Sequence, residues 1–340
     1  MTTDTTPAPA KDRPRAPGAA ARTPLLRRML ETPEVGVVLA CVLVFVALAL
    51  AKPAFAGAVN LQNMGADLAQ YGVIAIGESL VVLTGGIDLS VGALLGLSVV
   101  MVAWFNVKAG LPAGLAVLCT LALTGAVGLV HGLAVTKLAM QPFVTTLVTY
   151  TVAQGASLAV TSGIPVVGIS GFFGDLSQTY LAQIPVPTVL FAIIAAGAWF
   201  FLERTYAGRQ VYAVGGNKEA ARLAGIRGDR RIIAMYVTSS LLAGFGGVLV
   251  AGRMGVGSPT VGVGWELSAI AAAVIGGVSL VGGQGRILGI VAGAVLLELI
   301  NDGMTALAVN ADYTNIVLGT VLGLAILADR LRARRLARRG

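Results

Sequence analysis

Five carboxylates lie within long apolar stretches of the sequence: Glu78, Asp88, Glu266, Glu298 and Asp302. On insertion scales, a charged side chain at the centre of a membrane-spanning helix costs roughly 2.5 to 3.5 kcal/mol. Such groups therefore face a bundle interior or water, where they bind protons, cations or polar solutes or form structural hydrogen bonds. Glu78 and Glu298 lie deepest in their apolar stretches, and we expect them to line a polar cavity.

Asp88 follows a double glycine and precedes Ser90, so it could cap the next helix through that serine or through its own carboxylate. Apart from Lys52 at the very end of the first, no Lys or Arg lies within a predicted span, and the acidic residues form no continuous chain, which argues against a proton or sodium pathway. Structural hydrogen bonding is the alternative for these carboxylates. The candidates for a pathway or a gate are Glu78, Gly85, Gly86, Asp88, Ser90, Gly276, Gly277, Glu298 and Asn301.

One long hydrophilic interval, residues 203–231, interrupts the apolar chain and carries seven Lys or Arg residues. Within it the spacing predicts a short helix from Glu219 to Gly225. Asn217 is its N-cap, Glu219 offsets the helix dipole in the first turn, and Gly225 ends it. The interval is either a surface helix between two spans or a contact for a partner. Its candidate residues are Gly215, Gly216, Asn217, Glu219, Ala220, Ala221, Leu223 and Gly225.

Sequence motifs for enzymatic chemistry are absent. The full sequence contains no GxxxxGK[ST], HExxH, GxSxG or CxxC motif. His131 has no His, Cys or carboxylate at ligand spacing, and Cys41 and Cys119 lie in apolar runs, so we expect all three to be structural. The sequence therefore predicts no catalytic residue, no metal site and no cofactor bound by this chain.

The composition places these residues in a membrane. Of 340 residues 56% are hydrophobic and only 12% are charged, and the mean hydropathy is +0.85. These values lie outside the range of soluble domains and predict an all-α polytopic membrane protein. The net charge of +8 comes from the chain ends and one loop, so it indicates membrane topology and not a nucleic-acid partner.

About ten spans can be drawn, because roughly 20 apolar residues cross the hydrocarbon core. With the N-terminus inside, alternation leaves only Lys52, Lys108 and Arg253 outside, so both termini are predicted to be cytoplasmic. A signal peptide is the alternative for the first apolar run, and a retained span is favoured because the hydrophilic lead is long. The predicted spans are 35–52, 68–86, 89–106, 112–134, 141–161, 186–202, 232–251, 265–281, 287–304 and 312–328.

The predicted domains follow from this count. Residues 1–33 form a disordered basic cytoplasmic tail, residues 34–330 form the membrane domain, and residues 331–340 form a second basic tail. The largest segments on the outer side, 53–67 and 162–185, are either simple connectors or a docking surface for an external partner.

An internal echo suggests a repeat. Residues 83–92, LTGGIDLSVG, resemble residues 274–283, VIGGVSLVGG, and each closes one span and leads to the next. We expect spans 2–4 and 8–10 to be parallel repeats, an arrangement that places a pathway at the repeat interface.

The motifs together resemble the permease subunit of ABC importers for ribose and related monosaccharides. The resemblance runs from Asn60 to Asp329 and is strongest in LTGGIDLSVGALLGL (83–97), YAVGGNKEAARLAGI (212–226) and the long run of residues 266–304. It implies a multi-pass protein of the bacterial cytoplasmic (inner) membrane. The function it implies is uptake of a pentose, hexose or related polyol by alternating access.

The resemblance also implies partners. A second permease chain, identical or paralogous, would complete the pore. Two cytosolic ATPase subunits would use ATP and Mg, and an extracytoplasmic sugar-binding protein would deliver the substrate. The helix from Glu219 to Gly225 would then be the coupling helix that contacts the ATPase. An ion-coupled secondary sugar transporter and a non-transporting scaffold or receptor are the alternative functions.

Overall fold

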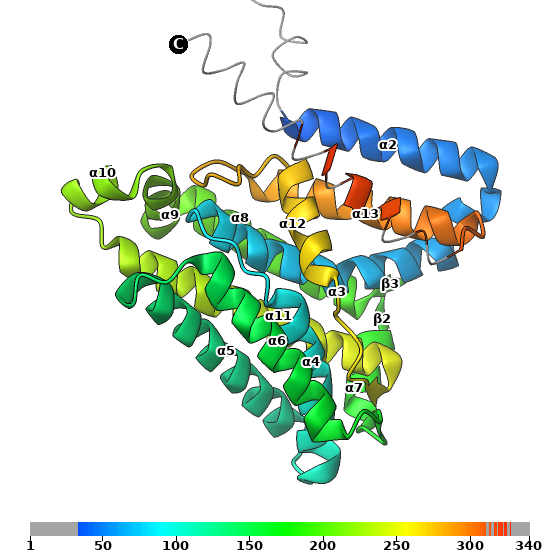
Figure 1. Ribbon diagram of the computed structural model, residues 1–340. Coiled ribbons are helices and arrows are strands. Elements are labelled where there is room, and N and C mark those ends of the chain that lie inside the picture. Colours follow the sequence, from blue (N-terminus) through cyan, green and yellow to red (C-terminus); the bar gives the residue numbers. More distant parts are fainter. Residues whose placement is uncertain are drawn as a thin grey trace, which may run out of the picture.

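The computed structural model describes residues 33–310 together with 313, 316–317, 319–321, 323–324 and 327. These residues form a helical bundle in which eight helices are long and apolar enough to cross a membrane (Figure 1). The eight are α2 (Pro33–Ala51), α3 (Ala58–Leu83), α4 (Val91–Ala103, continued by the π-helix η2, Trp104–Lys108), α5 (Ala113–Lys137), α6 (Pro142–Thr161), α8 (Val186–Arg204), α11 (Gly228–Met254) and α13 (Ile287–Ala306).

The remaining elements are short. They are the 3₁₀-helix η1 (Pro53–Ala56), the helices α7 (Gly171–Gln178), α9 (Tyr206–Gly216), α10 (Lys218–Leu223) and α12 (Trp265–Ile275), and the strands β1 (Val166–Val167), β2 (Tyr180–Leu181), β3 (Ile184–Pro185) and β4 (Val256–Gly257). The strands form two antiparallel pairs, β1 with β4 and β2 with β3.

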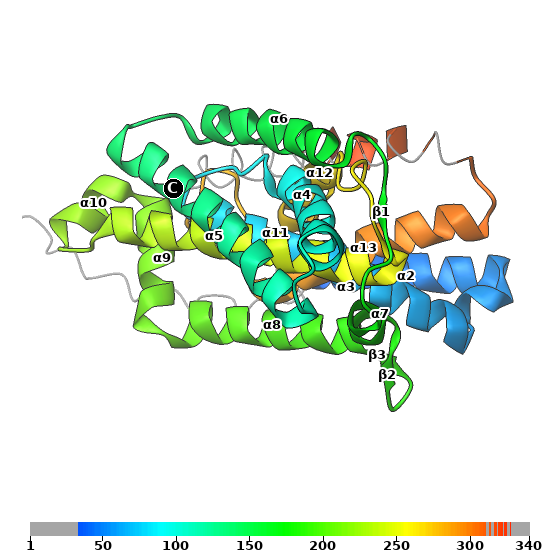
Figure 2. The same cartoon turned by 90° about the horizontal axis from the view of Figure 1, so that it is seen from below.

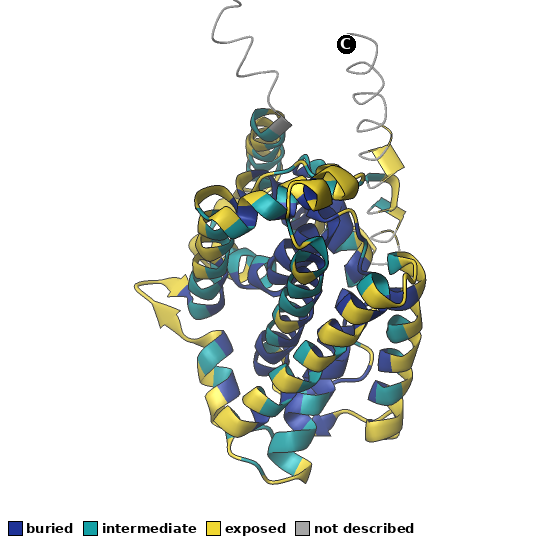
Figure 3. Ribbon diagram, turned by 90° about the vertical axis from the view of Figure 1, so that its left-hand side faces the viewer, coloured by how far each residue is buried: buried dark blue, intermediate teal, exposed yellow. Residues whose placement is uncertain are grey.

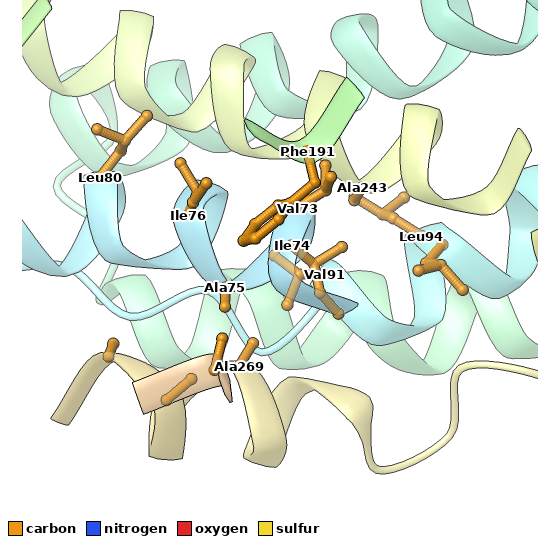
Figure 4. Packing of buried hydrophobic residues seen from close by; sticks show 14 of the residues in the cluster. Val73, Ile74, Ala75, Ile76, Leu80, Val91, Leu94, Phe191, Ala243 and Ala269 are labelled. Atoms are coloured by element: carbon orange, nitrogen blue, oxygen red, sulfur yellow. The ribbon is translucent and has the colours of Figure 1, made fainter. Parts of the chain in front are cut away.

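The core lies around α3, α4 and α11. Most residues of these three spans are buried (Figure 3). In the most apolar 18-residue window of α3, 83% of the residues are buried, whereas in the corresponding windows of α2 and α8 only 6% and 17% are buried. In Figure 4, Val73 and Ile76 of α3 meet Phe191 of α8 and Ala243 of α11. Because the outer helices show apolar side chains on their free faces, those faces suit lipid, and α3 is the axis of the bundle.

The basic residues gather at one end of the bundle, which we call the basic end. Lys137 at the end of α5 forms a 2.8 Å ion pair with Asp229 at the start of α11. Arg286, before α13, lies 3.8 Å from Glu34 at the start of α2. Figure 2 shows α9 and α10 together at this end. If the short α12 is counted between α11 and α13, the helices that cross the bundle run alternately toward and away from this end, and Lys52, Lys108 and Arg253 lie at the opposite end.

Two predicted spans need comment. The eighth, 265–281, is wrong in length, because α12 has only 11 residues and is about 16 Å long at 1.5 Å per residue. It ends at the double glycine, where Gly277 has a φ of +86°. About half of the tenth, 312–328, lies outside the described residues, as do all of the predicted tails 1–33 (except Pro33) and 331–340.

Smaller differences concern loops and cysteines. The second span starts at Ala58, ten residues before the predicted start at 68, so much of the segment 53–67 is helical. Segment 162–185 contains α7 and three short strands. Cys41 and Cys119, predicted as core residues, are half-buried free thiols, because α2 and α5 each turn one side away from the bundle.

The two echoed loops share one local feature. The Ser90 amide donates to Asp88 Oδ1 at 2.9 Å, and at the aligned position the Val281 amide donates to Ser279 Oγ at 3.3 Å. The next helix, however, starts immediately in the first loop and only at Ile287 in the second. The repeat of spans 2–4 and 8–10 stays a prediction.

Candidate functional site

The hydrophilic interval folds into two short helices that are capped by their own side chains. Thr205 Oγ1 accepts the Gly208 amide at 3.0 Å and starts α9. Asn217 ends α9, and its Oδ1 accepts the Ala220 amide at 2.9 Å to start α10. The predicted Asn217 cap is confirmed. The helix is Lys218–Leu223, slightly earlier than predicted, and Gly225 follows it with a φ of +77°.

One face of α10 is anchored and the other is free. Ala221 is buried in a small cluster with Val214, Val81 and Tyr236. Glu219 and Arg222 form a 2.6 Å ion pair on the outer side, and the hydrogen bond from Arg222 lowers the pKa of the Glu219 carboxyl. Leu223 is 77% exposed. The helix thus presents an apolar tip beside a neutralised ion pair.

The base of α10 is fastened to two spans by Asp229. Its carboxylate accepts a 2.8 Å hydrogen bond from Lys137 of α5 and lies 3.7 Å from Lys218 of α10. The hydrogen bond from Lys137 is the main cause of the lowered pKa of Asp229. A groove of about 650 Å³ lies here, lined mainly by charged side chains, among them Arg222, Arg227 and Arg230.

A glycine-rich junction joins this interval to the two echoed loops. The Gly283 amide donates to the Leu83 carbonyl at 3.0 Å, so the loop after α12 contacts the end of α3. Gly215 of α9 lies against the same place, and a Cβ there would be 1.8 Å from the Leu83 oxygen. We call this contact of Leu83, Gly215 and Gly283 the glycine junction. Only a residue without a side chain fits at position 215.

A second contact supports the junction. Tyr212 of α9 donates its hydroxyl to the Gly285 carbonyl at 3.0 Å. Burial raises the pKa of Tyr212 to about 12, so the hydroxyl keeps its proton at neutral pH. α9 is therefore in direct contact with the end of α3 and with the loop that follows α12.

The first echoed loop is held by a buried polar cluster. Asp88 Oδ1 accepts the amide and hydroxyl of Ser90 at 2.9 and 2.5 Å, and the Asp88 amide donates to Glu78 Oε1 at 3.2 Å. Ser239 of α11 lies 3.5 Å from the other Asp88 oxygen. Asp88 therefore shapes the turn before α4, whereas the Ser90 side chain makes no capping hydrogen bond. Glu78 is fully buried and is not among the residues that line the groove beside α10 or the cavity described below, so its role in a pathway stays a prediction.

His131 lies beside this cluster. Its Nε2 is 2.7 Å from Thr149 Oγ1, and its ring lies 6.0 Å from that of Tyr236. The described residues include no group of three or more His, Cys, Asp or Glu side chains that could hold a metal ion.

The predicted pathway residues separate into two groups. Glu78, Gly85, Gly86, Asp88 and Ser90 lie near the glycine junction, with Gly276 and Gly277 at the neighbouring end of α12, where Gly276 packs on Gly289 of α13.

The second group lies toward the opposite end of the bundle. Glu298 and Asn301 line a cavity of about 400 Å³ between α3, α12 and α13. Asp67, Gln70 and Tyr71 line it too, and the prediction missed them. Their signal was present, because they occupy positions i, i+3 and i+4 of one apolar helix and so share one face.

Comparisons with known proteins agree on one family. Residues 60–326 match the family described as branched-chain amino acid transport system / permease component. The chain is 36% identical to the ribose import permease protein RbsC of Bacillus subtilis (strain 168) over 302 residues, which is 88% of this chain and 94% of that protein. It is 40% identical to RbsC of Escherichia coli (strain K12) over 276 residues, 79% of this chain and 85% of that protein.

Permeases named for another sugar are also similar. The galactose/methyl galactoside import permease protein MglC of Escherichia coli (strain K12) is 32% identical over 298 residues, 82% of this chain and 89% of that protein. No solved structure matches the chain.

Proposed function

The chain belongs to the family of branched-chain amino acid transport system permease components, and we propose that it is the pore-forming permease subunit of an ATP-driven, binding-protein-dependent importer for a monosaccharide. Relatives named as import permeases for ribose and galactose support this substrate class. The partners are a second permease chain, two cytosolic ATPase subunits and an extracytoplasmic sugar-binding protein. ATP and Mg are used by the ATPase.

The distribution of charge supports an orientation. Among the described residues, the basic end holds Lys137, Arg286 and the basic residues of 203–231, whereas the opposite end holds only Lys52, Lys108 and Arg253. By the positive-inside rule we assign the basic end to the cytoplasm. The start of α2 then lies inside, which agrees with a cytoplasmic N-terminus. α10 faces the compartment that contains ATP, and the cavity lined by Glu298 lies toward the outer side.

The observation that carries the proposal is how α10 is attached. Its outer face is free, with Leu223 77% exposed. Its inner face is fixed by Ala221 and Asp229, and α9 leads from it to the glycine junction. A partner that pushes on Leu223 would therefore move the ends of α3 and α12. α10 is thus suited to be the coupling helix through which an ATPase drives alternating access.

The test is ATP-driven uptake of D-ribose or D-galactose into proteoliposomes that contain the chain, its partner ATPase and its binding protein. Leu223→Asp places a charge on the apolar tip of α10, and we expect it to abolish uptake and ATPase co-purification while the protein inserts normally. Leu138→Asp is the matched control, because Leu138 is also exposed (71%) at the basic end but lies outside α10 and the glycine junction.

Two results would contradict the proposal. If Leu223→Asp retains uptake and ATPase binding, α10 is not the coupling element. If uptake needs no ATPase and follows the proton gradient, the chain is an ion-coupled secondary transporter.

A further inference from the structure

The cavity between α3, α12 and α13 is built from a polar stripe on α3, a polar stripe on α13, and Trp265 and Ser268 at the start of α12. α3 contributes Asp67, Gln70 and Tyr71, and α13 contributes Glu298 and Asn301, all at helical spacing. The volume of about 400 Å³ lies within the range of about 300–1,000 Å³ that is usual for small-molecule sites. Three helices that are distant in sequence thus converge on one space.

The polar groups of the cavity are held in place. Glu298 is only 4% exposed and accepts a hydrogen bond from the Tyr71 hydroxyl. Asp67 accepts from Gln70 at 3.3 Å and pairs with Arg253 at 3.1 Å. No described residue donates to or accepts from the Asn301 side chain, which leaves its amide free for a ligand. The two carboxylates are therefore fixed by their partners, whereas the exposed Asn301 amide has hydrogen-bonding capacity left for a ligand.

An aromatic wall completes the cavity. The rings of Tyr71 and Trp265 meet edge to face at 6.3 Å, with both residues on the lining. Carboxylates accept hydrogen bonds, amides both accept and donate, and aromatic faces cover apolar surface. This combination matches a sugar, whose hydroxyls both donate and accept and whose ring carbons present an apolar C–H face.

The lining disfavours other ligand classes. Asp67, Glu298 and Asp302 give it an acidic character that repels anions. Among the described residues no group of His, Cys, Asp and Glu side chains has a metal-binding arrangement. A purely apolar solute would leave the carboxylates and amides without partners. An organic cation or a neutral polyhydroxylated molecule would satisfy the lining, and relatives named for ribose and galactose favour the second class.

We propose that this cavity is a binding site of the permease for the transported monosaccharide, occupied while the sugar passes between the binding protein and the cytoplasm. The inference rests on the proposed function and adds a location and a set of contacts to it. The Asn301 amide bonds sugar hydroxyls, and Trp265 covers the C–H face. Specificity then lies partly in the permease and not only in the binding protein.

The first experiment measures sugar uptake and ATP hydrolysis together in the complete reconstituted transporter. Asn301→Leu removes the amide at nearly constant volume, and we expect the sugar taken up per ATP to fall about fivefold, the factor for one net hydrogen bond. Trp265→Leu should lower it at least as far. The matched control is Gln141→Leu, which also replaces an exposed amide by leucine, but at the start of α6, outside the lining, where the side chain makes no capping hydrogen bond.

The second experiment observes binding directly. With Trp104→Phe and Trp199→Phe, Trp265 is the only tryptophan left in the chain. The purified permease is titrated with D-ribose, D-galactose and, for comparison, L-leucine. We expect a saturable fluorescence change with a sugar, which the added Asn301→Leu weakens about fivefold.

The outcomes separate this inference from the proposed function. If ATP-driven sugar uptake is normal in the wild type and unchanged in Asn301→Leu and Trp265→Leu, the cavity is not a sugar site, although the chain remains a sugar permease. A fluorescence change with leucine alone also overturns the inference. If the wild type takes up no sugar with its partners present, the proposed function itself fails.

Discussion

Replacing Gly215 by alanine should disrupt the glycine junction. The new Cβ would lie 1.8 Å from the Leu83 oxygen, whereas ordinary Cβ contacts begin near 3.4 Å, so α9 and α3 must separate by about 1.6 Å. Overpacking of this kind costs typically about 1–3 kcal/mol. Loss of the Gly283 to Leu83 hydrogen bond adds about 1 kcal/mol. The free energy of unfolding should therefore fall by about 2–4 kcal/mol.

Gly216 provides the control for this variant. It is the next residue of the same helix, and a Cβ there meets no atom within 4 Å. Gly216→Ala should leave stability unchanged or raise it by up to about 1 kcal/mol, since alanine favours helix. The assays are the melting temperature of the detergent-solubilised protein and ATP-driven uptake in proteoliposomes.

The pair of variants gives a sharp criterion. Gly215→Ala should melt at a lower temperature than Gly216→Ala and lose uptake although it inserts normally. If the two variants melt at the same temperature and transport equally, α9 does not pack on Leu83 and the route from α10 to α3 is refuted.

Three further predictions concern the same end of the bundle. Asn217→Ala should destabilise α10 by about 1 kcal/mol, because the helix loses its N-cap, and hydrogen exchange at the Ala220 amide should become faster. Asn217→Asp keeps a capping oxygen and should leave that exchange rate unchanged. Equal exchange rates in the two variants would contradict the cap. The carboxyl of Asp229 has a lowered pKa, so its stabilisation is complete above its ordinary value of about 3.9 and is lost as the pH falls through the lower folded value. Hydrogen exchange at the amides of α10 should therefore become faster below about pH 4. In Lys137→Met this increase should be smaller, because the ion pair is already absent. Identical pH profiles in the two proteins would refute the ion pair. Tyr236→Phe should change the melting temperature little, because the buried hydroxyl has no hydrogen-bond partner among the described residues; a large drop would reveal one.

Local features of this fold were predictable from the sequence. The apolar runs indicate most spans, because a span needs only length and hydrophobicity. The Asn217 cap is equally local, since the side chain bonds an amide three residues away. The short α12 was not predicted, because hydropathy does not register where a glycine pair ends a helix. The start of α3 at Ala58 was also not predicted, because the first turns of this helix carry polar residues such as Asn60 and Gln62.

The sites depend on contacts that no local pattern contains. The hydrogen bond from Gly283 to Leu83 joins segments two hundred residues apart. The cavity also needs α3, α12 and α13 to meet. Each of their polar stripes alone is equally typical of a helix facing a neighbour. Glu298 could be chosen from the sequence as a candidate cavity residue, because a carboxylate within a membrane span is costly. Trp265 could not, because an apolar side chain at this position is equally typical of a surface that faces lipid.

The two sites are connected by rigid elements. α3 carries Leu83 at the glycine junction and Tyr71 on the cavity wall, twelve residues or about 18 Å apart. α12 likewise starts at Trp265 in the cavity and ends beside the junction. Because α3 is buried along most of its length, it is more easily shifted as a body than bent. We therefore expect a push on α10 that moves Leu83 to move Tyr71 relative to Glu298 on α13 as well, so that force applied at the basic end changes the shape of the cavity that we propose for the sugar.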